Sequence, residues 1–257
     1  MWTLAASIGA ARGAQAPAAD VAAVTRAAEG GDLAAQTKLG VMFVNGTGVA
    51  PDDAQALAWF RRAADRGHAE AQVYLGLMYE SGNGVPANSA TAVMWFRRAA
   101  DQGSAKGQFN LGVSYQDGAG VPRDAATAAR WYRLAAEQGL AAAQNNLALL
   151  YAQGNGVPVD VAEAALWFRR AAEQGLNDAQ FNLGMAHFNG AGVARSFSEA
   201  FRWFAIAADL SRGADHDHYV NVRDAIATQL APDELAAARA RVTSWLAAFA
   251  TRPALDN

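Results

Sequence analysis

The 257-residue sequence predicts an all-α protein built from stacked repeats of two helices each. Tryptophan recurs at every 36th position through five consecutive blocks, and no insertion or deletion interrupts the series. Leucine and glycine recur with the same period. The periodic residues are Trp59, Trp95, Trp131, Trp167 and Trp203; Leu39, Leu75, Leu111, Leu147 and Leu183; and Gly67, Gly103, Gly139 and Gly175. A fixed period of this length is typical of solenoids, in which each repeat packs only against its neighbours.

The composition excludes several classes of protein. Hydrophobic residues make up 52% of the chain and charged residues 18%, which suits packed helices and argues against disorder. The formal net charge of -3 gives no bulk attraction to nucleic acid or to an anionic membrane. The sequence has no cysteine, which excludes disulfides, thiolate metal sites and a cysteine nucleophile. No uncharged apolar run reaches the roughly 18 residues of a membrane span, so we expect no direct membrane insertion.

Each block reads as two helices separated by a glycine-rich turn, as residues 69–104 illustrate. Apolar residues around Leu75 recur at helical spacing, and Gly82 then ends the first helix. Asn88 is suited to cap the second helix, because its side chain can accept from the free amides of the first turn. The equivalent caps are Asp52, Asp124, Asp160 and Ser196. Glu163 and Glu199, three residues after their caps, predict capping boxes.

The second helix places Trp95 between small residues, Ala92 and Ala99, which lets neighbouring helices approach closely. The Gly-x-Gly pairs, such as Gly82 and Gly84, resemble phosphate-binding loops only superficially. A phosphate loop follows a strand and opens a helix, whereas each of these pairs follows a helix. We therefore interpret them as turns.

These residues resemble the Sel1-like repeat, a relative of the tetratricopeptide repeat. The family pattern appears in the second block as Ala71, Leu75, Gly76, Tyr79, Gly82, Gly84, Val85, Ala92, Trp95, Ala99, Ala100 and Gly103. The match extends from about Asp32 to Ala208. The resemblance implies a right-handed α-solenoid of five 36-residue helix-pair repeats that acts as an adaptor or scaffold for protein complexes.

The sequence suggests caps at both ends of the solenoid. After Gly213 the pattern is lost, and Tyr219 and Trp245 fall on two further amphipathic helices, which predict a capping helical hairpin. The expected organisation is a weakly signal-like or disordered leader at 1-16, an N-terminal capping helix at 17-31, five repeats at 32-213, C-terminal capping helices at 214-250 and a tail at 251-257. A cleaved leader would make the protein periplasmic or secreted, and an uncleaved one would leave it cytoplasmic.

The candidate partner-binding residues precede the repeated leucine on each first helix. If the stacking follows the tetratricopeptide plan, this position faces the concave groove. It holds Lys38, Tyr74, Asn110, Asn146 and Asn182. The three asparagines could donate to and accept from a bound peptide backbone. The alternative is that they bond an adjacent repeat as part of the stacking. Phe109 and Phe181, one position earlier, are further groove candidates.

Other periodic residues have simpler interpretations. A glutamine in every block, from Gln36 to Gln180, indicates a structural role. Paired arginines such as Arg61 and Arg62 form a ridge that we expect acids four residues later to neutralise. The only cluster of metal-ligand types spans residues 215–218, and adjacent side chains rarely converge on one ion, so we expect no metal site.

The sequence therefore predicts a non-catalytic scaffold that binds a protein or peptide partner in the concave groove. No small-molecule cofactor and no nucleic-acid partner is expected. The alternative is an exported regulator of a membrane signalling or envelope pathway. A β-lactam-interacting hydrolase, known from a cysteine-rich subset of the family, is a third hypothesis, and the missing cysteines argue against it.

Overall fold

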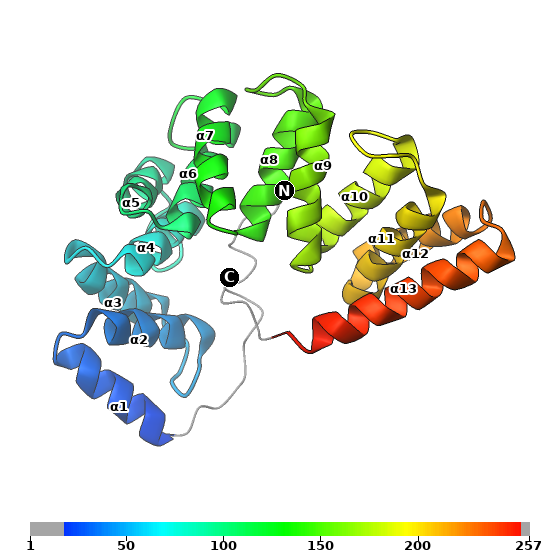
Figure 1. Cartoon of the computed structure of the whole chain (residues 1–257). Helices are drawn as coiled ribbons and strands as arrows, with labels where there is room; N and C mark the ends of the chain where they lie inside the picture. The colour runs from blue at the N-terminus through cyan, green and yellow to red at the C-terminus, as the bar shows by residue number, and fades with distance from the viewer. Residues whose placement is uncertain (1–17, 253–257) are drawn as a thin grey trace. The chain divides into compact units, whose positions relative to one another are not determined.

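The computed structural model describes residues 18–252, and within that part of the chain every regular element is an α-helix (Figure 1). The all-α prediction is therefore confirmed. The helices are α1 (Ala18–Glu29), α2 (Leu33–Asn45), α3 (Asp53–Asp65), α4 (Ala69–Ser81), α5 (Ser89–Asp101), α6 (Ala105–Asp117), α7 (Ala125–Glu137), α8 (Ala141–Gln153), α9 (Val161–Glu173), α10 (Asn177–Asn189), α11 (Phe197–Leu210), α12 (Gly213–Ala227) and α13 (Pro232–Ala250). The expected leader at 1-16 and most of the tail lie outside the described residues.

The predicted helix starts agree with the structure. Asn88 caps α5 by accepting from the amide of Thr91 at 3.0 Å, and Asp52, Asp124, Asp160 and Ser196 cap their helices in the same way. The predicted capping boxes are wrong, because the two glutamates bond elsewhere. Glu163 accepts from the indole of Trp167 at 2.8 Å, and Glu199 pairs with Arg202 at 3.2 Å.

A glycine in the first helix lets the second helix pack closely against it. A Cβ atom on Gly76 would lie 2.4 Å from Cε1 of Phe96, so only glycine leaves room for the ring without a shift. The same pairing recurs between Gly184 and Phe204. Both rings are fully buried, and they form the centre of the packing between the two helices of a repeat.

Buried glutamines join each repeat to the preceding one. Each Nε2 donates to the carbonyl of an alanine eight residues earlier, near the end of the preceding second helix, over 2.9–3.5 Å. The donors are Gln36, Gln72, Gln108, Gln144 and Gln180, and the acceptors are Ala28, Ala64, Ala100, Ala136 and Ala172. The structural role that periodicity predicted for these residues is therefore observed.

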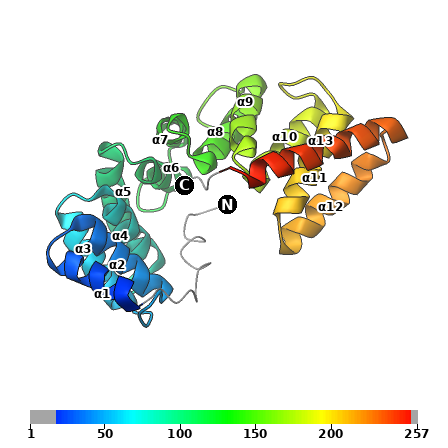
Figure 2. The ribbon, with the colours of Figure 1, turned by 60° about the horizontal axis from the view of Figure 1, so that its bottom comes forward.

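The contacts divide the chain into two units, residues 1–135 and 136–257. In the first unit, α1 packs on α2, and each later helix packs on the one before it through α6. The first helices α4 and α6 also touch each other directly. In the second unit the same succession runs from α8 to α12, and α13 returns to pack against α11 (Figure 2).

The last two helices are anchored to the repeats by different contacts. Tyr219 on α12 donates to Asp178 on α10 at 2.9 Å. Trp245 on α13 packs edge-on against Trp203, and Arg252 donates to the carbonyl of Glu173 at 2.7 Å. Both helices also pack on α11, and together they cover the end of the second unit.

One contact of the repeats continues beyond Gly213, although the sequence pattern is lost there. His216 lies one full repeat after Gln180, and its Nδ1 bonds the carbonyl of Ala208, eight residues earlier, at 2.9 Å. This is the contact that the glutamines make in the five repeats. Helix α12 therefore holds the register of a sixth first helix, which the sequence concealed because histidine replaces glutamine.

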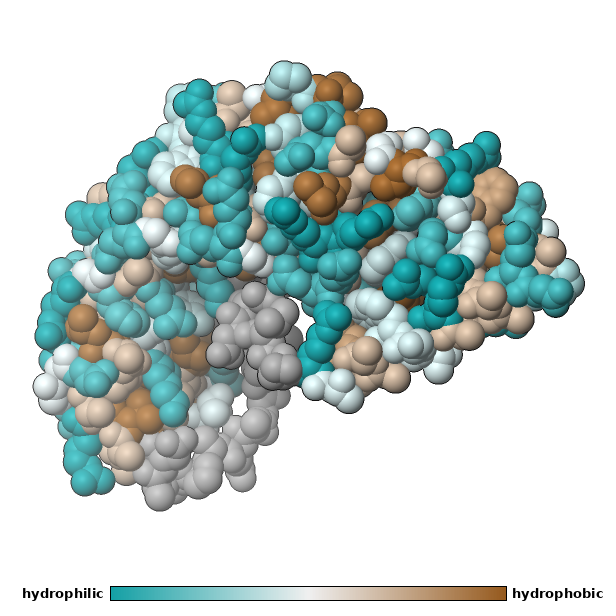
Figure 3. All heavy atoms as spheres, viewed as in Figure 1, coloured by the Kyte–Doolittle hydropathy of each residue, from teal (hydrophilic) through white to brown (hydrophobic). Residues whose placement is uncertain are grey.

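The face of the molecule seen in Figure 3 is mainly polar, with apolar side chains in small groups among hydrophilic ones. The exposed large apolar residues among those described are Met94, Leu134, Val159, Val161 and Leu166. No described helix is long and apolar enough to cross a bilayer.

Candidate functional site

The five predicted partner-binding positions differ in how much surface they offer. Lys38 is exposed, while Tyr74, Asn146 and Asn182 are partly exposed. Asn110 is only 4% exposed. The column therefore does not present a uniform row of side chains to a partner.

The three asparagines of this column are engaged in three different ways. Asn110 turns back along its own helix and donates to the carbonyl of Lys106 at 2.9 Å. Asn182 donates to Oδ1 of Asn145 on α8 at 3.1 Å, which links two neighbouring repeats. Asn146 makes no hydrogen bond to any other described residue. The stacking role thus accounts for Asn182, and the open amide of Asn146 is the one suited to a ligand.

Tyr74 contributes to the packing of the first unit. Its ring stacks on Phe60 at a centroid separation of 4.9 Å with 12° between the planes. Burial and then the nearby charge of Glu70 raise the pKa of its hydroxyl. Tyr74 therefore presents only part of its ring to solvent.

The structure corrects one of the two phenylalanine candidates. Phe109 is 1% exposed and packs against Tyr132 with ring centroids 5.7 Å apart, so its side chain is not available to a partner. Phe181 is partly exposed, but its ring packs against the rings of Phe204, His218 and Tyr219, with centroids 5.1–5.3 Å apart. It joins α10 to α11 and α12.

Five arginines of the second helices pack on aromatic rings or donate to tyrosine hydroxyls. Arg98 lies 4.5 Å from the ring centroid of Trp95, and Arg62 and Arg170 lie in the same way over Trp59 and Trp167. Arg61 and Arg97 donate to the hydroxyls of Tyr79 and Tyr115. Cation–π contacts and hydrogen bonds hold these five arginines, and the neutralisation expected from acids four residues later stays a prediction.

The described residues hold no group of three His, Asp or Glu side chains that could bind a metal ion. In the segment 215–218, His216 bonds the carbonyl of Ala208, and His218 packs against Phe181 and Tyr219. Burial, followed by the charge of Asp178 and the hydrogen bond to it, raises the pKa of Tyr219 well above its ordinary value. The Tyr219 hydroxyl therefore keeps its proton, which it donates to Asp178.

Two partly exposed asparagines of the predicted column lie on neighbouring first helices of the second unit. We name the surface around them the amide face and define it as Asn146 and Asn182 with Leu149 and Met185. All four are partly exposed on α8 and α10, and the Asn182–Asn145 hydrogen bond connects the two helices. Amide groups beside apolar side chains suit a peptide, because the amides can bond its backbone and the apolar groups can bury its side chains.

The fold and this surface define a helical repeat protein. The Sel1 repeat model matches residues 33–68, 69–104, 105–140, 141–176 and 177–211, so the chain belongs to the Sel1 repeat family. No curated protein matches the sequence.

Solved structures of bacterial proteins share the fold. A Sel1 repeat protein from Oxalobacter formigenes is 31% identical with a TM-score of 0.67, over 77% of this chain and 86% of that one. A protective antigen of uropathogenic Escherichia coli, c5321, is 28% identical with a TM-score of 0.56, over 93% of this chain and 61% of the antigen. The immunity protein PA5088 of Pseudomonas aeruginosa, at 21% identity and TM-score 0.50 over 87% of this chain and 79% of that one, resembles it in fold alone.

Proposed function

We propose that this protein is a non-catalytic scaffold that binds a protein or peptide partner through its first helices, with the amide face as the main contact. Membership of a family that is typically non-catalytic and implies protein binding supports the general function. The observation that carries the proposed contact is Asn146. Its amide is partly exposed and has no hydrogen-bond partner among the described residues, whereas its counterparts Asn110 and Asn182 do.

The proposed partner contacts are Lys38 and Tyr74 in the first unit and Asn146 and Asn182 in the second. Phe109 is withdrawn because it is buried, and Asn110 because its amide bonds its own helix. Phe181 can contribute only the exposed part of its ring.

Affinity capture with matched variants tests the proposal. Asn146→Ala removes an amide that bonds nothing in the described chain, so folding should be unaffected. If the amide bonds a partner, its loss should weaken binding by about 1 kcal/mol, or roughly fivefold. Ser244→Ala removes an exposed hydroxyl on α13, away from the first helices, and serves as the control.

The expected result is weaker capture of the same partner by Asn146→Ala and unchanged capture by Ser244→Ala. The measurement is the partner's dissociation constant for each variant once the captured protein is identified. Equal constants for all three proteins would refute the amide face, and the scaffold function would then need another surface.

A further inference from the structure

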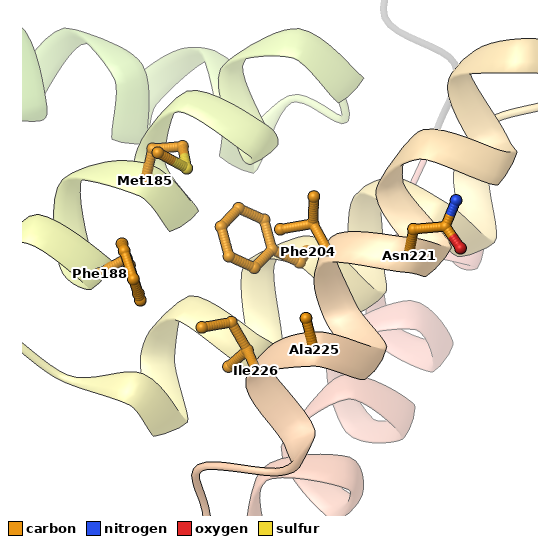
Figure 4. A pocket seen from close by; sticks show the side chains of 7 residues that line it. Met185, Phe188, Phe204, Asn221, Ala225 and Ile226 are labelled. Atoms are coloured by element: carbon orange, nitrogen blue, oxygen red, sulfur yellow. The ribbon is translucent and has the colours of Figure 1, made fainter.

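An apolar pocket of about 300 Å³ opens in the second unit between α10, α11 and α12 (Figure 4). Met185 and Phe188 of α10, Phe204 of α11, and Val222, Ala225 and Ile226 of α12 line it. Asn221 is its single polar lining residue. The pocket lies where the last complete repeat meets α12.

In the first unit, a valine from the next repeat packs against the corresponding apolar cluster. Each repeat carries a Gly-x-Gly-Val turn after its first helix, and Val121 is the valine of the third turn. Val121 packs against the buried cluster that contains Leu77 and Phe96 of the second repeat. Val49 of the first repeat packs in the same way against the cluster that contains Val24 of α1.

The repeat register shows what is missing at the pocket. Three repeats further along, Met185 stands in place of Leu77, and Phe204 stands in place of Phe96. The position of Val121 is taken by Gln229. Gln229 is exposed, and its amide bonds the neighbouring Thr228 hydroxyl at 3.2 Å.

The loss of the turn explains why the pocket is open. Ile226 and Thr228 replace the two glycines of the turn, so α12 runs on through Ala227 where the five earlier first helices have ended. The chain then enters α13, which packs on α11. No Gly-x-Gly-Val turn follows α12, and the apolar side chains that such a turn would cover line the pocket instead.

We propose that this pocket binds one aliphatic side chain of a protein partner, presented on an extended loop as Val121 is presented at the internal junction. The volume lies at the small end of the range for ligand sites and leaves room for a valine, isoleucine or leucine side chain. The apolar lining disfavours a charged or strongly polar group, which would lose its hydration without gaining a partner.

This inference rests on the proposed function only in taking the partner to be a protein. Burial of one aliphatic side chain should strengthen binding roughly tenfold to a hundredfold. Since Met185 belongs to both surfaces, the amide face and the pocket adjoin on α10. A partner segment could therefore bond the amides and place a side chain in the pocket.

The absence of cysteine from the sequence allows a direct test on the full chain. Ala225→Cys places one thiol at the pocket, and Ala247→Cys places one at an exposed position on α13 as the control. Each protein is equilibrated with an equal mixture of 3-methylbutyl, benzyl and 2-hydroxyethyl disulfides under mild reduction. Mass spectrometry then measures which group each cysteine carries, and thermal unfolding checks that both variants are folded.

We expect the 3-methylbutyl group to be enriched about tenfold or more over the hydroxyethyl group at position 225 and not at position 247. A peptide with the sequence Gly-Ala-Gly-Val-Pro-Arg, that of residues 118–123, should reduce this enrichment, and the same peptide with serine in place of valine should not. Equal labelling at both positions would overturn the proposal. Preference for the benzyl group without competition by the valine peptide would indicate a small-molecule site and would also overturn it.

The measurement is independent of the amide face. A pocket that fails this test leaves the Asn146→Ala result unaffected. An Asn146→Ala variant that binds its partner normally leaves the labelling at position 225 unaffected. The two proposals can therefore fail separately.

Discussion

The buried glutamines offer a sharp test of the packing, because two of them in the second unit differ in one contact. Gln144 donates to the carbonyl of Ala136 at 3.1 Å and accepts from Gln174 at 2.8 Å. Gln180 donates to the carbonyl of Ala172 at 3.1 Å, but its Oε1 is buried and accepts no hydrogen bond. The sequence explains the difference, since the position thirty residues later is Gln174 for the first glutamine and Leu210 for the second.

Replacement by methionine, which has a similar length and no polar atoms, should affect the two sites differently. Gln144→Met removes two hydrogen bonds and should destabilise the unit by about 2 kcal/mol. Gln180→Met removes one bond worth about 1 kcal/mol, but it also removes a buried unpaired oxygen that costs about 1–3 kcal/mol. The second variant should therefore be as stable as the wild type or more stable.

Urea unfolding of the full chain, followed by tryptophan fluorescence, measures the difference. With a slope of about 1–3 kcal/mol per molar urea, a change of about 2 kcal/mol moves the midpoint by roughly 1 M. Both substitutions lie in the same unit, so the comparison does not depend on whether the two units unfold together. Equal destabilisation by the two variants would refute the assignment of the unpaired oxygen.

Three further outcomes follow from individual side chains. Asn110→Ala should destabilise the first unit by about 1 kcal/mol in urea unfolding, because it removes the part-buried hydrogen bond to the carbonyl of Lys106. An unchanged free energy of unfolding would contradict a packing role for Asn110. Burial, followed by the charge of Asp117, raises the pKa of Glu80, so the charged carboxylate destabilises the fold at neutral pH. Glu80→Gln should therefore raise the thermal unfolding midpoint at pH 7. The difference between the two proteins should vanish in acid, where Glu80 is protonated. The raised pKa of Tyr219 means that the unfolded chain releases its phenol proton first, so stability should fall above about pH 10, less steeply in Tyr219→Phe.

The repeat region could be predicted from the sequence because its contacts repeat. The same residue types recur at every 36th position, so one argument about caps and glycine turns applies five times. The N-caps are local, since Asn88 bonds an amide only three residues away, and local bonds leave a clear sequence pattern. The register of α12 was missed because a ring nitrogen of His216 makes the hydrogen bond that a side-chain amide nitrogen makes in the glutamines.

The candidate site was harder to predict, because a helix position does not reveal which neighbour its side chain reaches. Asn110, Asn146 and Asn182 hold equivalent positions in the sequence. Asn110 nevertheless bonds its own helix, Asn182 bonds the previous repeat, and Asn146 has no hydrogen bond to another described residue. Their burial depends on neighbours that differ between blocks. No sequence motif marks the pocket beside Ile226, because the pocket lies where the Gly-x-Gly-Val turn of the earlier repeats is missing after α12.

The most direct test of the proposed function asks whether the amide face touches a protein partner. A photo-crosslinking amino acid placed at position 146 or at position 244, both in otherwise unchanged full-length protein, reports contact from a first helix and from α13 of the same unit. We predict a crosslinked protein adduct from position 146 and none from position 244. An adduct from position 244 with none from position 146 would contradict the proposed function.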